Sequence, residues 1–394
     1  MGWRSHIKGE LHQTREEPER ALLVGVESRS TGDGWQAADS LEELRHLASS
    51  AGAEVVGIEC QRMAKPSGTH YLGKGKLQEV VELKDRLDYN LLVCDDELSP
   101  RQQRLLEAEV GVRVIDRTAL ILDIFARQAR TKEGKLQVEL AQHKYLLPRL
   151  VGRWGHLERL GGGIGTRGPG ESQLETDRRL IRTRIRRLES ELEAVSRHRE
   201  VYRARRRKGG VPLVALVGYT NAGKSTLFNE LSRAGVTVEN RLFSTLDPVT
   251  RRIRLPDGGA VLMTDTVGFI HKLPPSIVAS FRTTLEELHD ADLLLHVVDI
   301  THPFASYQHA TVESILADMG LMAKPVVTAL NKIDLLTGLD EPYDAWSASE
   351  RLGFGRPDFI LVSAVTGRGI DVLLQRIASF VQDLPSSDSG SSGQ

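Results

Sequence analysis

The chain has 394 residues, 40% of them hydrophobic and 27% charged, which is the composition of a globular protein with two or three domains. Its longest apolar runs are too short to span a bilayer, and the first residues, MGWRSH, lack the apolar core of a secretion signal. We therefore expect a cytoplasmic protein that could associate with membranes only peripherally. Cys60 and Cys94 lie in apolar, strand-like stretches and are expected to be core residues, so neither a disulfide nor a zinc site is expected.

Charge is unevenly distributed along the chain, although the formal net charge is only -1. Between Arg178 and Lys208 there are thirteen Lys and Arg residues against four Glu, a local excess of nine positive charges. Such an excess indicates contact with a polyanion at one place on the molecule.

The first expected domain covers residues 20–117 and follows an N-terminal extension at residues 1–19. Short apolar runs such as ALLVGV and NLLVCDDE alternate with helical patterns such as SLEELRHLASSAG. This alternation is typical of a small α/β domain with a mainly parallel sheet. The glycine-rich stretch HYLGKGKLQEV could place Lys74 and Lys76 against an anion, but an ordinary exposed helix start is the more frequent meaning of such a sequence.

Residues 118–208 contain two long helical patterns, which together predict an antiparallel helical hairpin. Apolar side chains in the later pattern recur with the heptad spacing of a coiled-coil seam. They are Leu174, Ile181, Ile185, Leu188, Leu192 and Val195. The earlier pattern runs from about Thr118 to Leu147 and offers Leu136, Leu140 and Leu147 as the matching stripe.

A long loop at residues 152–170, GRWGHLERLGGGIGTRGPG, joins the two helical patterns and contains eight glycines. Loops longer than about a dozen residues without structure of their own are usually functional or disordered. Glycine allows close approach of the backbone, arginine binds phosphate and tryptophan stacks on bases, so the composition favours an RNA-contacting tip over a flexible connector. The expected RNA-contacting residues are Arg153, Trp154, Arg159, Gly161, Gly162, Gly163, Arg167, Arg178, Arg179, Arg182 and Arg186.

The third expected domain, residues 211–384, follows a hinge at Gly209 and Gly210 and again alternates strands with helices. The Ser- and Gly-rich residues 385–394 are expected to form a disordered tail. After the strand LVALV comes GYTNAGKS, residues 218–225, which matches the P-loop pattern in its required context. In such a loop the backbone N–H groups surround the phosphates, Lys224 adds a charge and the Ser225 hydroxyl ligates Mg²⁺. The sequence therefore predicts a P-loop NTPase.

The segment DTVGFIHKLP, residues 265–274, supplies the remaining expected phosphate and metal contacts. Asp265 ends an apolar strand and would anchor Mg²⁺ through water, while the Gly268 N–H would bond the γ-phosphate. A threonine between the P-loop and Asp265 should close over the metal; Thr245 and Thr250 both qualify by chemistry, and we favour Thr245. The expected catalytic residues are Lys224, Thr245 and Gly268, and the expected metal ligands are Ser225 and Thr245.

The stretch NKID, residues 331–334, predicts that the base is guanine. The Asp334 carboxylate can accept two hydrogen bonds from guanine, whereas adenine would leave it unpaired, so an ATPase or a small-molecule kinase is disfavoured. Asn331 would bond the other edge of the base and Lys332 would cover its face. The expected nucleotide site comprises Gly218, Tyr219, Thr220, Asn221, Ala222, Gly223, Lys224, Ser225, Thr226, Phe243, Ser244, Thr245, Leu246, Asp247, Asp265, Thr266, Val267, Gly268, Asn331, Lys332, Ile333, Asp334, Ser363, Ala364 and Val365.

One position in this motif set is unusual, because Phe269 follows Gly268 where a water-positioning glutamine is expected. An apolar ring cannot orient water, so the backbone near Thr245, a side chain such as His271 or a group on a partner must do so. Arg241 could stabilise charge in cis, although surface or RNA contact is the more frequent role of such a residue. These features predict a free enzyme that is slow and is activated by its partner.

Taken together, GYTNAGKSTLFN, FSTLDPVTR, DTVGFI, FRTTLEE, NKID and SAVTG resemble the HflX family of translational GTPases within the Obg-HflX superfamily. The more specific motifs lie outside the GTPase region: HYLGKGKLQE, DRTALILDIFARQARTKEGKLQVELAQ and GGGIGTRGPGESQLETDRR. The resemblance covers roughly residues 20 to 380.

The resemblance implies an α/β fold in which an N-terminal α/β domain with a long helical hairpin precedes a Ras-like P-loop GTPase domain. It also implies Mg²⁺ as cofactor, GTP and GDP as ligands, and the large ribosomal subunit with its RNA as partner. The charged composition gives no reason to expect more than a monomer. Family members split or rescue stalled and idle ribosomes, with the hairpin loop directed to the peptidyl-transferase centre. The alternative is a GTP-dependent RNA-binding or ribosome-assembly factor in which hydrolysis only resets the bound state.

Overall fold

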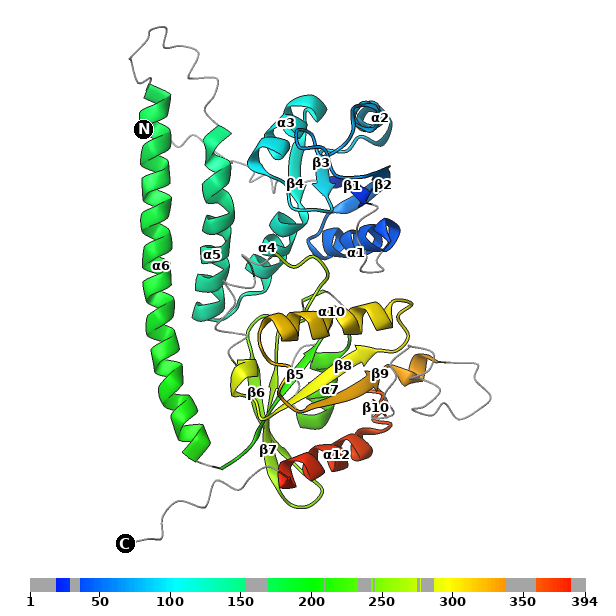
Figure 1. The fold of residues 1–394 in the computed structure, drawn as a ribbon, viewed down its shortest axis with the longest axis vertical. Coiled ribbons are helices and arrows are strands. Elements are labelled where there is room, and N and C mark those ends of the chain that lie inside the picture. Colours follow the sequence, from blue (N-terminus) through cyan, green and yellow to red (C-terminus); the bar gives the residue numbers. More distant parts are fainter. Residues whose placement is uncertain are drawn as a thin grey trace, which may run out of the picture.

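The computed structural model describes residues 19–28, 36–152, 169–208, 210–232, 242–243, 245–274, 277, 287–336 and 359–383. Two sheet-containing parts lie one above the other, and a long helix extends beside them (Figure 1). The predicted loop residues 153–168, the tail 385–394 and Gly209 of the hinge lie outside the described residues.

The N-terminal sheet, in the part of the chain that the structure describes, is parallel throughout and has the strand order β2-β1-β3-β4. Its elements are β1 (Arg20–Ser28), α1 (Ala37–Ser50), β2 (Glu54–Met63), α2 (Lys74–Leu87), β3 (Leu91–Cys94), α3 (Pro100–Val110) and β4 (Arg113–Asp116). Alternate residues of β1 face opposite cores, with Leu23 packing in the α1 cluster and Leu22 in the α2 and α3 cluster. Helices therefore cover both faces, as a parallel sheet requires.

Two sequence expectations in this domain have a clear outcome. Cys94 is buried, but Cys60 is exposed, so the expectation of two core cysteines is wrong for Cys60 because β2 is an edge strand with alternating exposure. At the glycine-rich stretch, Lys76 forms ion pairs with Glu59 at 2.9 Å and with Glu79 at 2.7 Å. This lysine therefore supports an ordinary helix start.

The helical part consists of α4 (Arg117–Gln128), α5 (Lys132–Leu146), the short 3-10 helix η1 (Leu147–Gly152) and α6 (Pro169–Lys208). The expectation of one helix from Thr118 to Leu147 is wrong. The helix breaks at Ala129, whose ψ of 109° is extended, and α5 restarts at Thr131, whose hydroxyl accepts a hydrogen bond from the Gly134 N–H at 3.0 Å.

Helices α5 and α6 pack side by side along an apolar seam (Figure 1). The seam consists of Leu136, Leu140, Leu188 and Leu192, with Ile185 at its edge. These residues come from the two stripes predicted from the sequence. Beside the seam, the Arg184 guanidinium donates to both carboxylate oxygens of Glu139, at 2.7 and 2.8 Å.

The C-terminal sheet, within the described residues, has the order β10-β9-β8-β5-β7-β6, and only the β6–β7 pair is antiparallel. Its strands are β5 (Leu213–Gly218), β6 (Val249–Arg254), β7 (Ala260–Asp265), β8 (Leu293–Asp299), β9 (Val326–Asn331) and β10 (Phe359–Leu361). The helices are α7 (Lys224–Ser232), α10 (Ala305–Asp318) and α12 (Ile370–Gln382), with the 3-10 turn η3 (Ile333–Leu335). The carboxyl ends of β5, β7, β8 and β9 meet at one edge, where open α/β sheets bind ligands.

A continuous hydrophobic cluster joins the two sheet domains. It contains Leu23 of β1, Ile124 and Phe125 of α4, and Phe243 and Phe269 of the C-terminal domain, all at most 2% exposed. The rings of Phe125 and Phe243 meet edge to face at 4.7 Å. The predicted fold class is confirmed, and the two domains are held together by a shared core.

Candidate nucleotide site

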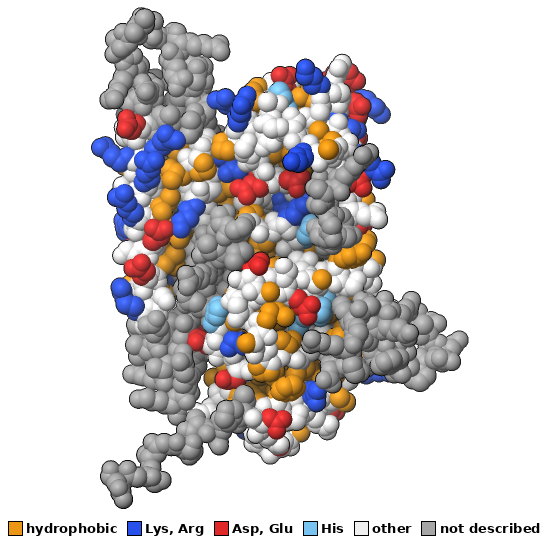
Figure 2. All heavy atoms as spheres, viewed as in Figure 1, with side chains coloured by type: hydrophobic (Ala, Val, Ile, Leu, Met, Phe, Trp, Pro, Cys, Tyr) orange, Lys and Arg blue, Asp and Glu red, His pale blue; other side chains and the backbone are white. Residues whose placement is uncertain are grey.

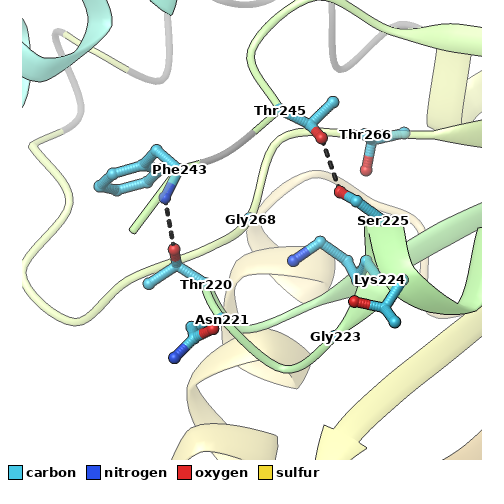
Figure 3. A pocket seen from close by; sticks show the side chains of 10 residues that line it. Thr220, Asn221, Gly223, Lys224, Ser225, Phe243, Thr245, Thr266 and Gly268 are labelled. Carbon is cyan, nitrogen blue, oxygen red and sulfur yellow. Dashed lines mark hydrogen bonds between the residues drawn. The ribbon is translucent and has the colours of Figure 1, made fainter. Parts of the chain in front are cut away.

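The P-loop lies between the end of β5 and the start of α7, and a pocket opens over it (Figure 3). Its lining consists of Thr220, Asn221, Gly223, Lys224, Ser225, Thr226, Phe243, Thr245, Thr266 and Gly268. All ten belong to the site predicted from the sequence. At Gly268 a Cβ atom would lie 2.8 Å from Lys224 Nζ and 2.8 Å from Thr220 Cα, so only glycine fits between the loop and the lysine.

Lys224 is buried at the base of this pocket. Its ammonium donates to the carbonyl oxygens of Tyr219 at 2.8 Å and Gly218 at 3.2 Å. Burial lowers the pKa of Lys224 to about 8, and the nearby Asp265 carboxylate opposes that shift. A phosphate at this position would supply the negative charge that favours the ammonium form.

Three oxygen-bearing side chains converge beside Lys224. The hydroxyls of Ser225 and Thr245 lie 2.7 Å apart and both donate to Asp265 Oδ2, at 2.7 and 2.8 Å. Asp265 is 1% exposed, and its Oδ1 has no hydrogen-bond partner among the described residues. Burial raises the pKa of Asp265, while these hydroxyl hydrogen bonds lower it. Two hydroxyls and a carboxylate with one oxygen lacking a hydrogen-bond partner among the described residues are the hard oxygen ligands that suit Mg²⁺.

The two candidate metal threonines are placed differently by the structure. Thr245 reaches Ser225 and Asp265, whereas Thr250 lies in β6 and shares a hydrogen bond of 2.8 Å with Thr264 of β7. The geometry therefore favours Thr245 over Thr250.

At the base end of the site, Asn331 connects the P-loop to a second loop. Its amide donates to Ala222 O at 3.0 Å and accepts from the Ala364 N–H at 3.0 Å, so it organises the loops around the base. Lys332 pairs with Asp299 at 2.6 Å. The Ser363 hydroxyl donates to Asp334 Oδ1 at 2.6 Å, which fixes the orientation of the carboxylate expected to bind guanine.

Comparison with known proteins matches almost the whole chain. Family models described as GTP-binding GTPase N-terminal, GTP-binding GTPase Middle Region and 50S ribosome-binding GTPase match residues 38–126, 128–206 and 213–332. The GTPase HflX of Caldanaerobacter subterraneus is 48% identical over 367 residues, covering 93% of this chain and 82% of the relative. That of Alkalihalophilus pseudofirmus is 52% identical, covering 82% and 76%, and that of Escherichia coli is 45% identical, covering 91% and 82%.

The chain belongs to the GTPase HflX family. It is a GTP-hydrolysing enzyme, and the family resemblance of its motifs is confirmed. Among solved structures, a GTP-binding protein from Sulfolobus solfataricus in complex with GDP is 25% identical, with a TM-score of 0.47, covering 93% of this chain and all of that one.

In this HflX-family chain, Phe269 is a core residue. It is 1% exposed, and its backbone joins the P-loop: the Thr220 N–H donates to Phe269 O at 2.7 Å, and the Phe269 N–H donates to Gly218 O at 3.1 Å. The ring packs in the cluster that joins the two domains. His271, which the sequence offered as a water-holding side chain, is not among the residues that line the pocket.

A buried ionic network, which no motif in the sequence indicates, lies behind this loop. Arg117, 1% exposed, pairs with Glu43 at 2.8 Å and Asp95 at 2.5 Å, and Lys272 pairs with Asp95 at 2.5 Å and Asp96 at 2.6 Å. Burial alone would raise the pKa of Asp95, but the cations of Arg117 and Lys272 hold it well below its usual range. The network joins the loop after Gly268 to the N-terminal domain.

Two predicted nucleotide-site residues direct their side chains to the N-terminal half of the chain. The Tyr219 hydroxyl donates to Glu43 and accepts from the His271 N–H at 2.7 Å. The Asp247 carboxylate accepts from the backbone N–H groups of Arg130 and Thr131. Their nucleotide contacts would therefore come from the backbone, and no periodicity or motif signals these side-chain partners.

The remaining predicted site residues are buried, exposed or outside the residues that the structure describes. Leu246 and Val267 are buried in the shared core, and Val365 is exposed. Ser244, Arg241 and the predicted RNA-contacting residues Arg153, Trp154, Arg159, Gly161, Gly162, Gly163 and Arg167 lie outside the described residues. On α6, Arg179, Arg182 and Arg186 are exposed and Arg178 is half-buried, and Lys and Arg side chains gather along this helix (Figure 2).

Proposed function

We propose that this protein is a Mg²⁺-dependent GTPase that binds the large ribosomal subunit and dissociates stalled or idle ribosomes, with hydrolysis stimulated by the ribosome. The observation that carries the proposal is the match of residues 213–332 to the 50S ribosome-binding GTPase model, within a chain similar to HflX along most of its length. We also propose that it acts in the cytoplasm, where a ribosomal partner would be found, and that it does so as a monomer. Among the described residues, no helix is long and apolar enough to cross a membrane.

The nucleotide site supplies groups for each part of Mg²⁺-GTP. Ser225 and Thr245 would ligate the metal. The Asp265 carboxylate, which accepts hydrogen bonds from both hydroxyls, would anchor it through water. The bound metal would neutralise charge on the phosphate oxygens. Lys224 would contact the β- and γ-phosphates, and the Gly268 N–H would bond the γ-phosphate. Asp334, held by Ser363, would select guanine.

The ribosomal contact is proposed on helix α6 and the glycine-rich loop that precedes it. Arg179, Arg182 and Arg186 have the i, i+3, i+7 spacing that places side chains on one helix face, and all three are exposed. They lie in the segment with the local excess of positive charge, which suits phosphate contacts with RNA. In the loop itself, glycine and arginine would approach the RNA backbone and Trp154 would stack on a base.

Incubation of intact ribosomes with the protein and a non-hydrolysable GTP analogue tests the ribosome-splitting activity. We expect the subunits to separate in a sucrose gradient with the analogue and to stay associated with GDP. Binding restricted to immature subunits or free RNA, without separation, would contradict the proposal and support an assembly factor. An Asp334→Ala variant, which should lose guanine selectivity, provides the nucleotide-dependence control.

A further inference from the structure

The loop that carries the metal-site threonine is attached to the helical hairpin. Asp247, two residues beyond Thr245, accepts hydrogen bonds from the backbone N–H groups of Arg130 at 2.9 Å and Thr131 at 2.8 Å, and from the Thr131 hydroxyl. Thr131 is the N-cap of α5. We call this contact the Asp247 latch. It places a carboxylate at the positive end of a helix that packs along α6.

Two further contacts hold the same loop against the same corner. The Gln128 side chain, at the end of α4, donates to Leu242 O at 3.2 Å. Phe243, in the left-handed region with φ of 59°, packs its ring against Phe125 of α4, while its N–H donates to Thr220 in the P-loop at 2.8 Å. The loop is thus held on one side by the P-loop and on the other by the α4–α5 corner.

Helix α5 has a glycine where the Asp247 carboxylate approaches it. A Cβ atom on Gly134 would lie 2.3 Å from Asp247 Oδ1, so any larger residue would displace the carboxylate. Glycine lowers the intrinsic stability of a helix, and at this position it leaves room for a group from the other domain. Thr131 serves both sides, because its hydroxyl accepts from the Gly134 N–H and donates to Asp247.

We propose that Asp247 is a positioning residue, which couples recognition of the nucleoside triphosphate at Thr245 to helix α5. When Thr245 lies beside Ser225, as in this structure, the short segment to Asp247 also reaches Thr131. A γ-phosphate and its metal favour that position of Thr245, so they also favour the closed latch. By thermodynamic reciprocity, a partner that holds α5 in its latched position raises the preference for GTP over GDP.

Binding measurements on the full chain without ribosomes test this coupling, so the outcome is independent of the proposed ribosomal function. The affinities for GDP and for a non-hydrolysable GTP analogue are compared in wild type, Asp247→Ala and Gly134→Ala. We expect both variants to lose about fivefold of the preference for the analogue over GDP, the equilibrium equivalent of one lost helix cap. Asp247→Asn, which keeps an acceptor oxygen, should retain part of the preference.

The variants separate the coupling from a simple loss of structure. Gly134→Ala introduces a better helix former, so α5 itself is not weakened, and only the latch is displaced. Asp257 lies in the distant turn between β6 and β7, where it accepts hydrogen bonds from the Gly259 N–H and from the Gln382 side chain of α12. Asp257→Ala should therefore leave the preference unchanged. An unchanged preference in both latch variants, or an equal loss in Asp257→Ala, would overturn the proposal.

Discussion

Lys224 links nucleotide binding to pH. Its pKa is lowered to about 8 by burial, so above that pH the free side chain is increasingly neutral, whereas bound phosphates favour the charged form. Nucleotide binding should therefore take up as much as one proton at about pH 9, and affinity should fall as pH rises from about 8 to 10. Below the free pKa the ammonium is charged in both states, and this group takes up no proton.

Calorimetry in two buffers with different ionisation enthalpies measures this proton uptake directly. Lys224→Arg serves as the control where it still binds nucleotide, because arginine stays charged and should abolish the uptake at about pH 9. Equal binding enthalpies for the wild type in the two buffers at that pH would show that Lys224 is already charged without nucleotide.

Phe269 tests whether the position after Gly268 has a structural or a chemical role. Because its ring is 1% exposed in the core between the domains, Phe269→Ala should lower the free energy of unfolding by about 3–5 kcal/mol. Phe269→Leu fills most of the space and should keep most of the GTPase activity. A large loss of turnover in the leucine variant, with unchanged thermal stability and GTP affinity, would mean that the ring contributes to more than packing.

The buried ionic network fixes the loop after Gly268 to the N-terminal domain. Arg117→Ala leaves Asp95 and Glu43 without their shared buried cation, and it should destabilise the protein by about 3–5 kcal/mol. Arg127→Ala removes an arginine of the same helix whose ion pair with Asp123 is exposed, and it should cost less than about 1 kcal/mol. Similar thermal unfolding midpoints for the two variants would contradict the role given to the network.

Helix α6 provides a separate prediction for RNA binding. Replacing the exposed Arg182 and Arg186 by glutamine removes two expected phosphate contacts. The slope of log affinity against log salt concentration should therefore decrease in magnitude by about two in filter-binding or fluorescence titrations with ribosomal RNA. An unchanged slope would remove this helix face from the RNA contact.

Which elements could be predicted from the sequence depends on whether their cause is local. The P-loop and the α5–α6 seam follow from the spacing of neighbouring residues, and the predicted seam residues Leu136 and Leu188 indeed meet. The break between α4 and α5 has a local signal, a threonine N-cap with an acidic first turn, which the continuous helical pattern from Thr118 to Leu147 hides. The carboxylate that binds at Thr131 has no local signal, because it comes from Asp247, 116 residues away.

The difference between local and distant causes also explains which residues of the site could not be predicted. The P-loop residues that line the pocket follow from the sequence, because phosphate binding demands particular residues at fixed offsets. Arg117 and Glu43 act through partners in other elements, and a single sequence contains no sign of which distant charges will meet. Cys60 shows the corresponding error for burial, since an apolar run does not reveal that its strand lies at the edge of the sheet.

The nucleotide site contacts both the N-terminal domain and the helical hairpin. Both loops that would respond to the γ-phosphate contact the N-terminal half, through Asp247 on one side and Lys272 on the other. No glutamine follows Gly268, and the phenylalanine in its place is buried. This arrangement suits a GTPase whose rate of hydrolysis depends on the partner that binds the helical hairpin.

Activation by the ribosome is tested by the rate of GTP hydrolysis with and without purified large ribosomal subunits. We predict slow turnover by the free protein and strong stimulation by the large subunit. That stimulation should be reduced when Arg182 and Arg186 are replaced by glutamine. Turnover that is unaffected by the large subunit, in a preparation that binds GTP normally, would contradict activation by the ribosome.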